Sequence, residues 1–126
     1  MRRLVLQMQM SADGFVGSLD GSPWQLWDWG ENNGWDEELR ASFNAHFERL
    51  DAILLNRKTL EEGYLDHWEK AASRYPVEPF YAFARRITDA DKFVSSDRLQ
   101  HVTWPRTTVV SGELEREVCA LKSRPG

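Results

Sequence analysis

Two short segments of the sequence combine cationic and hydroxyl side chains where an expected strand ends. The first is Asn56-Arg57-Lys58-Thr59, which follows the apolar run 52–55 and leads into an expected helix. Free N–H groups and the dipole at a helix start attract phosphate, and an arginine can hold it through two hydrogen bonds. These residues predict an anion site, with a solvated loop that ends in an ordinary Thr59 cap as the alternative.

The second segment, Ser95-Ser96-Asp97-Arg98, closes the expected strand 92–95. Ligands of open α/β sheets bind beyond the carboxyl ends of the strands. Ser95 and Ser96 are therefore candidates for contacts with a phosphate or a ribose. The alternative is a plain turn, because Ser-Ser-Asp is common turn chemistry.

Asp13-Gly14 follows the expected first strand, residues 3–10, in which Leu4, Leu6, Met8 and Met10 share one face. Gly14 allows a tight turn and the close approach of a flat ligand. Asp13 is either a hydrogen-bonding carboxylate in a cleft or part of an Asx turn.

Residues 15–35 hold an unusual concentration of tryptophan and show no regular period. We expect a long ordered loop, because tryptophan side chains need something to pack on. The indoles could stack on a planar or sugar ligand, or pack together to hold the loop in place. They are Trp24, Trp27, Trp29 and Trp35.

Other chemistry is not indicated. The sequence lacks the glycine-rich nucleotide motifs, the zinc-protease motif and the nucleophile elbow. The three histidines show no ligand spacing and are expected at the surface, so no metal site is predicted. The single cysteine, Cys119, excludes an internal disulfide and is expected to be an inert core residue.

The composition indicates one globular domain, residues 1–126. With 41% hydrophobic and 29% charged residues, the chain is neither disordered nor a membrane protein. A net charge of −4 without a basic cluster argues against nucleic acid as a partner. The start lacks a continuous apolar signal region, which favours a cytoplasmic protein.

The remaining patterns alternate strands with helices and predict an α/β sheet with mostly parallel neighbours. The expected strands are 3–10, 52–55, 92–95 and 107–110. The expected helices are 36–50, about 59–68, about 79–87, and a last one that begins at Ser111 or Gly112. A strand should follow this last helix, so we expect the domain to be incomplete at its C-terminal end.

Taken in order, the segments resemble the reductase domain of bacterial riboflavin biosynthesis, the RibD C-terminal domain, and its dihydrofolate-reductase-like relatives. The resemblance rests on four motifs: Ser-Ala-Asp-Gly-Phe-Val from Ser11, Asn-Arg-Lys-Thr from Asn56, Lys-Phe-Val-Ser from Lys92, and Leu-Lys-Ser-Arg-Pro-Gly from Leu121. Together the motifs span the chain. One departure is Asn56, where the family usually has glycine.

The resemblance implies a three-layer αβα fold with a mostly parallel central sheet, whose C-terminal strands are missing here. It also implies NADPH as cofactor and a small-molecule substrate. We further expect a homodimer. The implied cofactor-binding residues are Asn56, Arg57, Lys58, Thr59, Ser95 and Ser96. The residues expected on the substrate side are Asp13, as the catalytic candidate, with Gly14, Phe15, Trp24 and Trp27.

The function that the resemblance implies is NADPH-dependent reduction of a heterocycle. It resembles 5-amino-6-(5-phosphoribosylamino)uracil reductase or dihydrofolate reductase. The alternative is a protein on the same scaffold that binds a nucleotide or an aromatic ligand without turnover. In the family, a further strand lies between the first and second strands, so we expect strand 3–10 to have no neighbour on that side.

Overall fold

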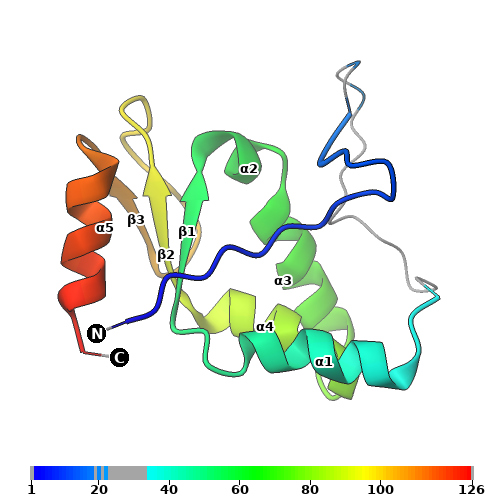
Figure 1. Ribbon diagram of the computed structural model, residues 1–126. Coiled ribbons are helices and arrows are strands. Elements are labelled where there is room, and N and C mark those ends of the chain that lie inside the picture. Colours follow the sequence, from blue (N-terminus) through cyan, green and yellow to red (C-terminus); the bar gives the residue numbers. More distant parts are fainter. Residues whose placement is uncertain (1, 19, 21, 23–33, 126) are drawn as a thin grey trace.

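The structure, a computed structural model, describes residues 2–18, 20, 22 and 34–125. Its sheet has three parallel strands in the order β1-β2-β3 (Figure 1). The strands are β1 (Ala52–Asn56), β2 (Asp91–Ser95) and β3 (Thr107–Val110). Leu54 pairs with Phe93, and Phe93 pairs with Thr108. Three of the four expected strands and their parallel arrangement are thereby confirmed.

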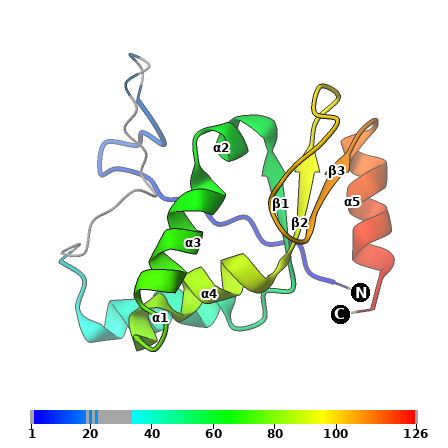
Figure 2. The same cartoon turned by 180° about the vertical axis from the view of Figure 1, so that it is seen from behind.

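Helices cover both faces of the sheet, which confirms the three-layer expectation. One face carries α1 (Glu37–Phe47), α2 (Arg57–Glu61), α3 (Tyr64–Arg74) and α4 (Ala82–Asp89). On the other face lies α5 (Leu114–Ser123) (Figures 1 and 2). Neighbouring residues of β2 point to opposite layers. Val94 packs in the core with the larger helical layer, while the Arg124 guanidinium lies 5.7 Å from the Phe93 ring centroid.

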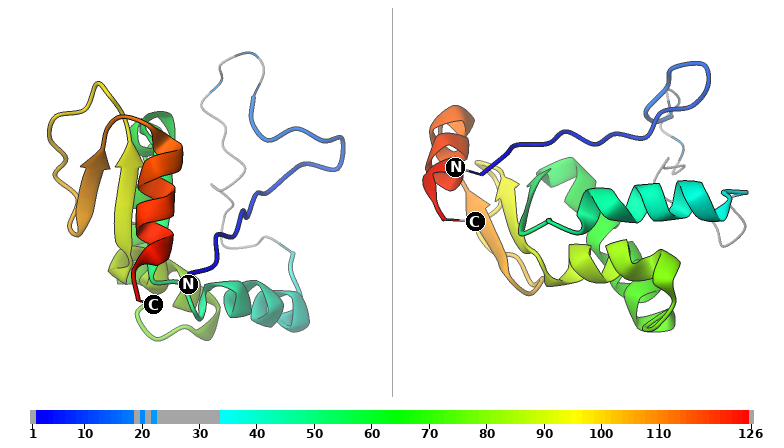
Figure 3. Two further views of the ribbon diagram at one scale, coloured as in Figure 1. Left: turned by 60° about the vertical axis from the view of Figure 1, so that its left-hand side comes forward. Right: turned by 60° about the horizontal axis from the view of Figure 1, so that its bottom comes forward.

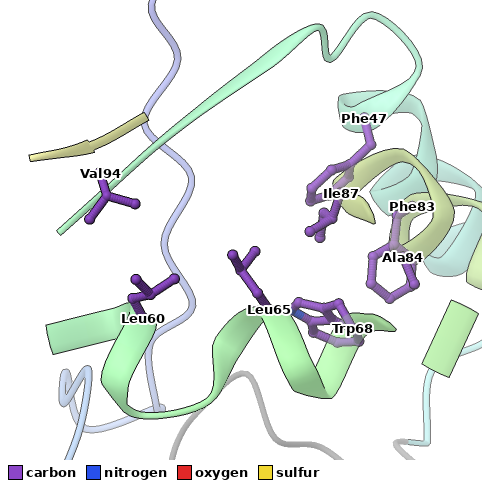
Figure 4. Close-up of a cluster of buried hydrophobic side chains, with 8 residues drawn as sticks. All are labelled: Phe47, Leu60, Leu65, Trp68, Phe83, Ala84, Ile87 and Val94. Atoms are coloured by element: carbon purple, nitrogen blue, oxygen red, sulfur yellow. The ribbon is translucent and has the colours of Figure 1, made fainter. Parts of the chain in front are cut away.

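Aromatic side chains dominate the core between the sheet and the larger helical layer. Phe83 lies at its centre, with ring centroids of Phe43 and Trp68 each 4.9 Å away. Figure 4 shows how the buried side chains of this cluster face one another. The cluster consists of Phe47, Leu60, Leu65, Trp68, Phe83, Ala84, Ile87 and Val94.

A partly buried side-chain amide joins α1 to the start of α4. Asn44 Oδ1 accepts a hydrogen bond from the Phe83 N–H at 2.8 Å, and Asn44 Nδ2 donates to the Phe80 carbonyl at 2.8 Å. The first N–H groups of a helix have no partner within the helix. Asn44 therefore acts as a cap from a distant element, and it fixes how α1 and α4 pack.

The expected helix 59–68 is wrong in its bounds, because the structure has two helices there. The helical conformation is interrupted between α2 and α3 at Gly63, whose φ of 86° is left-handed. Glycine takes this conformation without steric cost and commonly ends a helix. The break lets α3 begin at Tyr64 in a new direction and continue to Arg74.

Smaller differences concern the other helices. The expected helix 79–87 is a 3₁₀ turn, Pro79–Tyr81, followed by α4. The last helix begins at Leu114 rather than at 111 or 112, and α1 ends at Phe47 rather than at 50.

Cys119 is exposed on α5, so its expected place in the core is wrong. Apolar neighbours in sequence do not bury a helical residue, since only one face of α5 meets the sheet.

The predicted strand 3–10 is also wrong, since these residues form no ladder in the structure. They run outside the sheet in both views of Figure 3. Their large apolar side chains stay exposed, from 60% for Val5 to 84% for Leu6. Alternation alone makes a strand only where a neighbour completes its hydrogen bonds. The expectation that strand 3–10 would lack a neighbour on one side assumed a strand that these residues do not form, so it stays a prediction.

The ordered-loop prediction for 15–35 falls largely outside the described residues, as do Trp24, Trp27 and Trp29. Trp35 is described. Its ring centroid lies 5.1 Å from that of Phe43 in an edge contact. Of the two roles considered for the tryptophans, ligand stacking and packing, the structure has Trp35 in packing.

Burial gives Tyr64 an unusual titration. Desolvation raises the pKa of Tyr64 from 10.0 to about 12, with a smaller opposite effect from a hydrogen bond with Trp68. Between these values the unfolded chain loses a proton that the folded protein keeps, so stability falls as the pH rises through the window. We expect Tyr64→Phe to remove up to about 2–3 kcal/mol of this pH dependence. Urea unfolding on both sides of the window measures it, with Tyr75→Phe as the control that should behave like the wild type.

Candidate functional site

Two of the predicted site segments lie side by side at the carboxyl edge of the sheet, which is the end at which the parallel strands β1 and β2 both finish. Asn56 is the last residue of β1, Ser95 is the last residue of β2, and the two are paired in the parallel register. This edge lies at the upper end of the sheet in Figure 1, next to α2. The turn after β1 and the turn after β2 therefore form one polar surface.

Asn56 holds the start of α2. Its Oδ1 accepts the Thr59 N–H at 2.8 Å, and its backbone is extended, with a φ of −93°. Asparagine adopts left-handed backbone more readily than most residues, but Asn56 does not adopt it here. Instead, the side chain satisfies one of the helix-start N–H groups that would otherwise face an anion.

The two cations of this turn are paired with carboxylates one helical turn further on. Arg57 Nη1 lies 2.6 Å from Glu61 Oε1 and 2.5 Å from Glu61 Oε2. Lys58 Nζ lies 3.6 Å from Glu62 Oε1. The formal charges of the four side chains cancel. The i,i+4 spacing could have revealed both pairs from the sequence.

The loop after β2 is tied to its own backbone. Ser96 Oγ accepts the N–H groups of Arg98 and Leu99, each at 3.1 Å. The Ser96 N–H donates to the Val110 carbonyl at 3.0 Å, and Asp97 Oδ1 accepts the Gly112 N–H at 3.1 Å. Ser95 is partly buried beside Asn56. Ser96 therefore has the turn role that was given as the alternative. Ser95 lies at the carboxyl edge, beside Asn56.

Asp13 lies in a self-contained turn. The Ser11 hydroxyl donates to Asp13 Oδ1 at 2.5 Å, and the Gly14 N–H donates to the Ser11 carbonyl at 2.9 Å. Gly14 has a left-handed φ of 89°, and Phe15 is 41% exposed. The structure does not bring this turn to the Asn56–Ser95 edge, and its substrate-side role stays a prediction. Trp24 and Trp27 lie outside the described residues.

The sequence matches the RibD C-terminal domain family over residues 2–123. The chain belongs to that family. No match was found among curated proteins. As a RibD C-terminal domain, the chain has a dihydrofolate-reductase-like fold and belongs to a family of reductases.

Two hollows of this RibD C-terminal domain, formed by described residues, lie away from the carboxyl edge. One, of about 490 Å³, opens at the amino ends of β2 and β3 beside Asp91 and Arg106. Another, of about 750 Å³, lies on the outer face of α3 beside Glu69 and Arg74. Both are open surface depressions with charged walls, and Arg106 is itself paired with Asp91 at 2.8 Å. Neither has the apolar enclosure typical of a substrate pocket.

Two negative observations apply to the described part of this RibD C-terminal domain. None of its helices is long and apolar enough to cross a membrane. No group of three or more His, Cys, Asp or Glu side chains among these residues is arranged to hold a metal ion.

Proposed function

We propose that the chain is an NADPH-dependent reductase of a small heterocyclic substrate, either a riboflavin precursor or dihydrofolate. The observation that carries the proposal is the register between Asn56 and Ser95, which joins the two predicted cofactor segments at one edge. The family assignment over residues 2–123 supports the reaction class. A homodimer is part of the same proposal.

The residues of this edge fit an anionic cofactor. Arg57 and Lys58 supply two cations, and Thr59 and Ser95 supply hydroxyl groups within the two turns. The side chains of Arg57 and Lys58 are 38% and 82% exposed, so their pairs with Glu61 and Glu62 are worth only about 0.2–1 kcal/mol each. A phosphate can replace such weak partners, because arginine also holds a phosphate through two charge-assisted bonds.

Each residue has a distinct part in this proposal. Arg57 and Lys58 bind the phosphates, Thr59 and Ser95 orient the nucleotide by hydrogen bonds, and Asn56 keeps α2 in position. NADPH supplies a hydride when it is bound. Asp13, Gly14 and Phe15 are assigned to the substrate side on the family resemblance alone, and Trp24 and Trp27, which the resemblance also implies, lie outside the described residues.

The first functional prediction concerns Arg57→Ala. Loss of a charge-assisted, two-bond contact with phosphate costs about 1.5–3 kcal/mol, which is about a 10- to 150-fold rise in the Kd for NADPH. Isothermal titration calorimetry measures the change. Arg116→Ala, an exposed arginine on α5, is the control and should bind like the wild type. Equal affinities for Arg57→Ala and Arg116→Ala would contradict the assignment of this turn.

The second functional prediction has the opposite sign. Glu61→Gln removes the carboxylate that competes for Arg57, so NADPH should bind more tightly, by up to about fivefold. The gain should disappear in the double variant Arg57→Ala/Glu61→Gln. The control Glu69→Gln, on α3, should change the affinity little. A gain that persists without Arg57 would mean a general charge effect and not the release of this side chain.

One observation favours the second candidate, a nucleotide- or aromatic-ligand-binding protein without turnover. Asn56 uses its side chain to cap α2, and Asp13 is held in its own turn away from the edge. A binding site whose catalytic candidate lies in a separate turn can hold a cofactor and still not reduce a substrate. The two candidates differ in one measurement, the oxidation of NADPH in the presence of dihydrofolate or a riboflavin precursor. Binding without oxidation would favour the second candidate.

A further inference from the structure

The carboxyl end of β3 lies in the same row as the two segments of the proposed cofactor site. Asn56 pairs with Ser95, and Ser95 pairs with Val110, so the last residues of the three strands stand side by side across the sheet. Neighbouring strands are about 4.8 Å apart. The turn Ser111-Gly112, which follows Val110, therefore begins at the same edge as the proposed cofactor segments (Figure 1).

Two hydrogen bonds hold this turn against the loop after β2. The Ser96 N–H donates to the Val110 carbonyl at 3.0 Å, which continues the contact between β2 and β3 by one residue. One residue further on, Asp97 Oδ1 accepts the Gly112 N–H at 3.1 Å. Gly112 has a φ of 100°, a backbone conformation that glycine takes without steric cost. The side chain of Asp97 thus extends the contact between the two turns beyond the end of the ladder.

The bond from Asp97 belongs to a set of contacts that order the loop next to Ser95. Ser96 Oγ accepts the N–H groups of Arg98 and Leu99. Leu99 is partly buried and packs against the core cluster. A loop that is ordered before its ligand binds loses less conformational entropy on binding, and the affinity is higher for that reason.

The charge of Asp97 acts in the opposite direction. Asp97 is exposed, and the ligand proposed for this edge carries phosphates. A carboxylate and a phosphate repel each other, although solvent screens the repulsion between exposed groups. The acceptor oxygen of Asp97 and its negative charge should therefore affect the affinity with opposite signs.

We propose that Asp97 is a positioning residue of the cofactor site. By holding the turn after β3, it orders the loop that presents Ser95 to the cofactor. This inference rests on the proposed function, since it takes NADPH as the ligand. Asp97 acts through the loop and does not itself contact the cofactor.

Two substitutions separate the hydrogen bond of Asp97 from its charge. Asp97→Asn keeps the Oδ1 acceptor and removes the charge, whereas Asp97→Ala removes both. By isothermal titration calorimetry, Asp97→Asn should bind NADPH up to about threefold more tightly than the wild type. Asp97→Ala should bind about threefold to tenfold more weakly than Asp97→Asn. The control Asp89→Ala removes an exposed carboxylate before the opposite end of β2 and should bind like the wild type.

Hydrogen exchange of the Gly112 amide, followed by NMR, measures the order of the turn directly. Exchange should be slow in the wild type and in Asp97→Asn, and at least about fivefold faster in Asp97→Ala. Saturating NADPH should slow it again in Asp97→Ala, because the bound cofactor orders the loop. Asp97 lies outside the core cluster, so both variants should keep the circular dichroism spectrum of the wild type.

The outcomes distinguish this inference from the proposed function. If the wild type does not bind NADPH, the proposed function is wrong and this inference falls with it. If the wild type binds NADPH and the Kd values of Asp97→Asn and Asp97→Ala are equal, the inference alone is overturned. A purely structural role would lower the thermal midpoint of Asp97→Ala and leave these two Kd values equal.

Discussion

Phe83→Ala should lower the free energy of unfolding by about 3–5 kcal/mol. Phe83 is 1% exposed and lies at the centre of the aromatic cluster, with ring centroids of Phe43, Phe47 and Trp68 within 5.6 Å. Alanine leaves a cavity that these rings cannot fill, because they are held in place on α1 and α3. Domains of this size have a stability of about 5–15 kcal/mol, so the loss is a large part of the total.

Urea unfolding followed by tryptophan fluorescence measures this effect, since Trp68 contacts Phe83 directly. The control is Val77→Ala, because Val77 is 82% exposed on the loop before α4. Its unfolding free energy should lie within about 0.5 kcal/mol of the wild type. A loss below about 1 kcal/mol in Phe83→Ala would mean that the cluster repacks, contrary to the arrangement described.

Lys92→Met should lower the free energy of unfolding by about 2–4 kcal/mol. Lys92 is 4% exposed, and its Nζ donates to the carbonyls of Thr88 at 2.6 Å and Ala90 at 2.9 Å. These carbonyls belong to the end of α4, where helix carbonyls lack partners within the helix. Methionine fills similar space but leaves both carbonyls without a donor. Lys70→Met, on the exposed side of α3, is the matched control and should change little.

Because Lys92 is buried, we also expect the free energy of unfolding to depend on pH. Burial lowers the pKa of Lys92 below 10.5, and the nearby Arg106 adds to this effect. As the pH rises toward 10.5, the unfolded chain still holds a proton that the folded protein has released, so the wild type gains relative stability. The difference in unfolding free energy between the wild type and Lys92→Met should therefore widen over this range. A constant difference would mean that Lys92 stays charged in the folded protein.

Much of the fold could be predicted from local patterns. The segments 52–55, 92–95 and 107–110 predicted three strands correctly, because each holds apolar or β-branched residues that favour strands. The break at Gly63 was missed, since a glycine within a helical pattern is compatible with either one helix or two. Lys92 was interpreted only as the start of a strand, because its partners are carbonyls of a helix whose end the sequence did not fix.

Less of the candidate site could be predicted. The sequence predicted both segments at the carboxyl ends of strands. It did not predict the strand order β1-β2-β3, which brings Asn56 beside Ser95. The ion pairs of Arg57 and Lys58 follow from i,i+4 spacing but depend on α2 beginning at residue 57 and not at 59. The prediction of strand 3–10 was wrong for a non-local reason. The hydrogen-bond ladder of a strand needs a neighbouring strand, and no property of residues 3–10 themselves can supply one.

The position of the core along the chain sets the order of folding. Its residues run from Phe47 to Val94 without any contribution from the first ten residues. Contacts between segments close in sequence form quickly, since they close short loops. Residues 4–10 leave the ribosome before the core segments do, and their leucines and methionines lie in water until those segments have been made. Nascent chains with exposed apolar segments are prone to aggregate and depend on chaperones. During synthesis, residues 4–10 are therefore exposed to such capture.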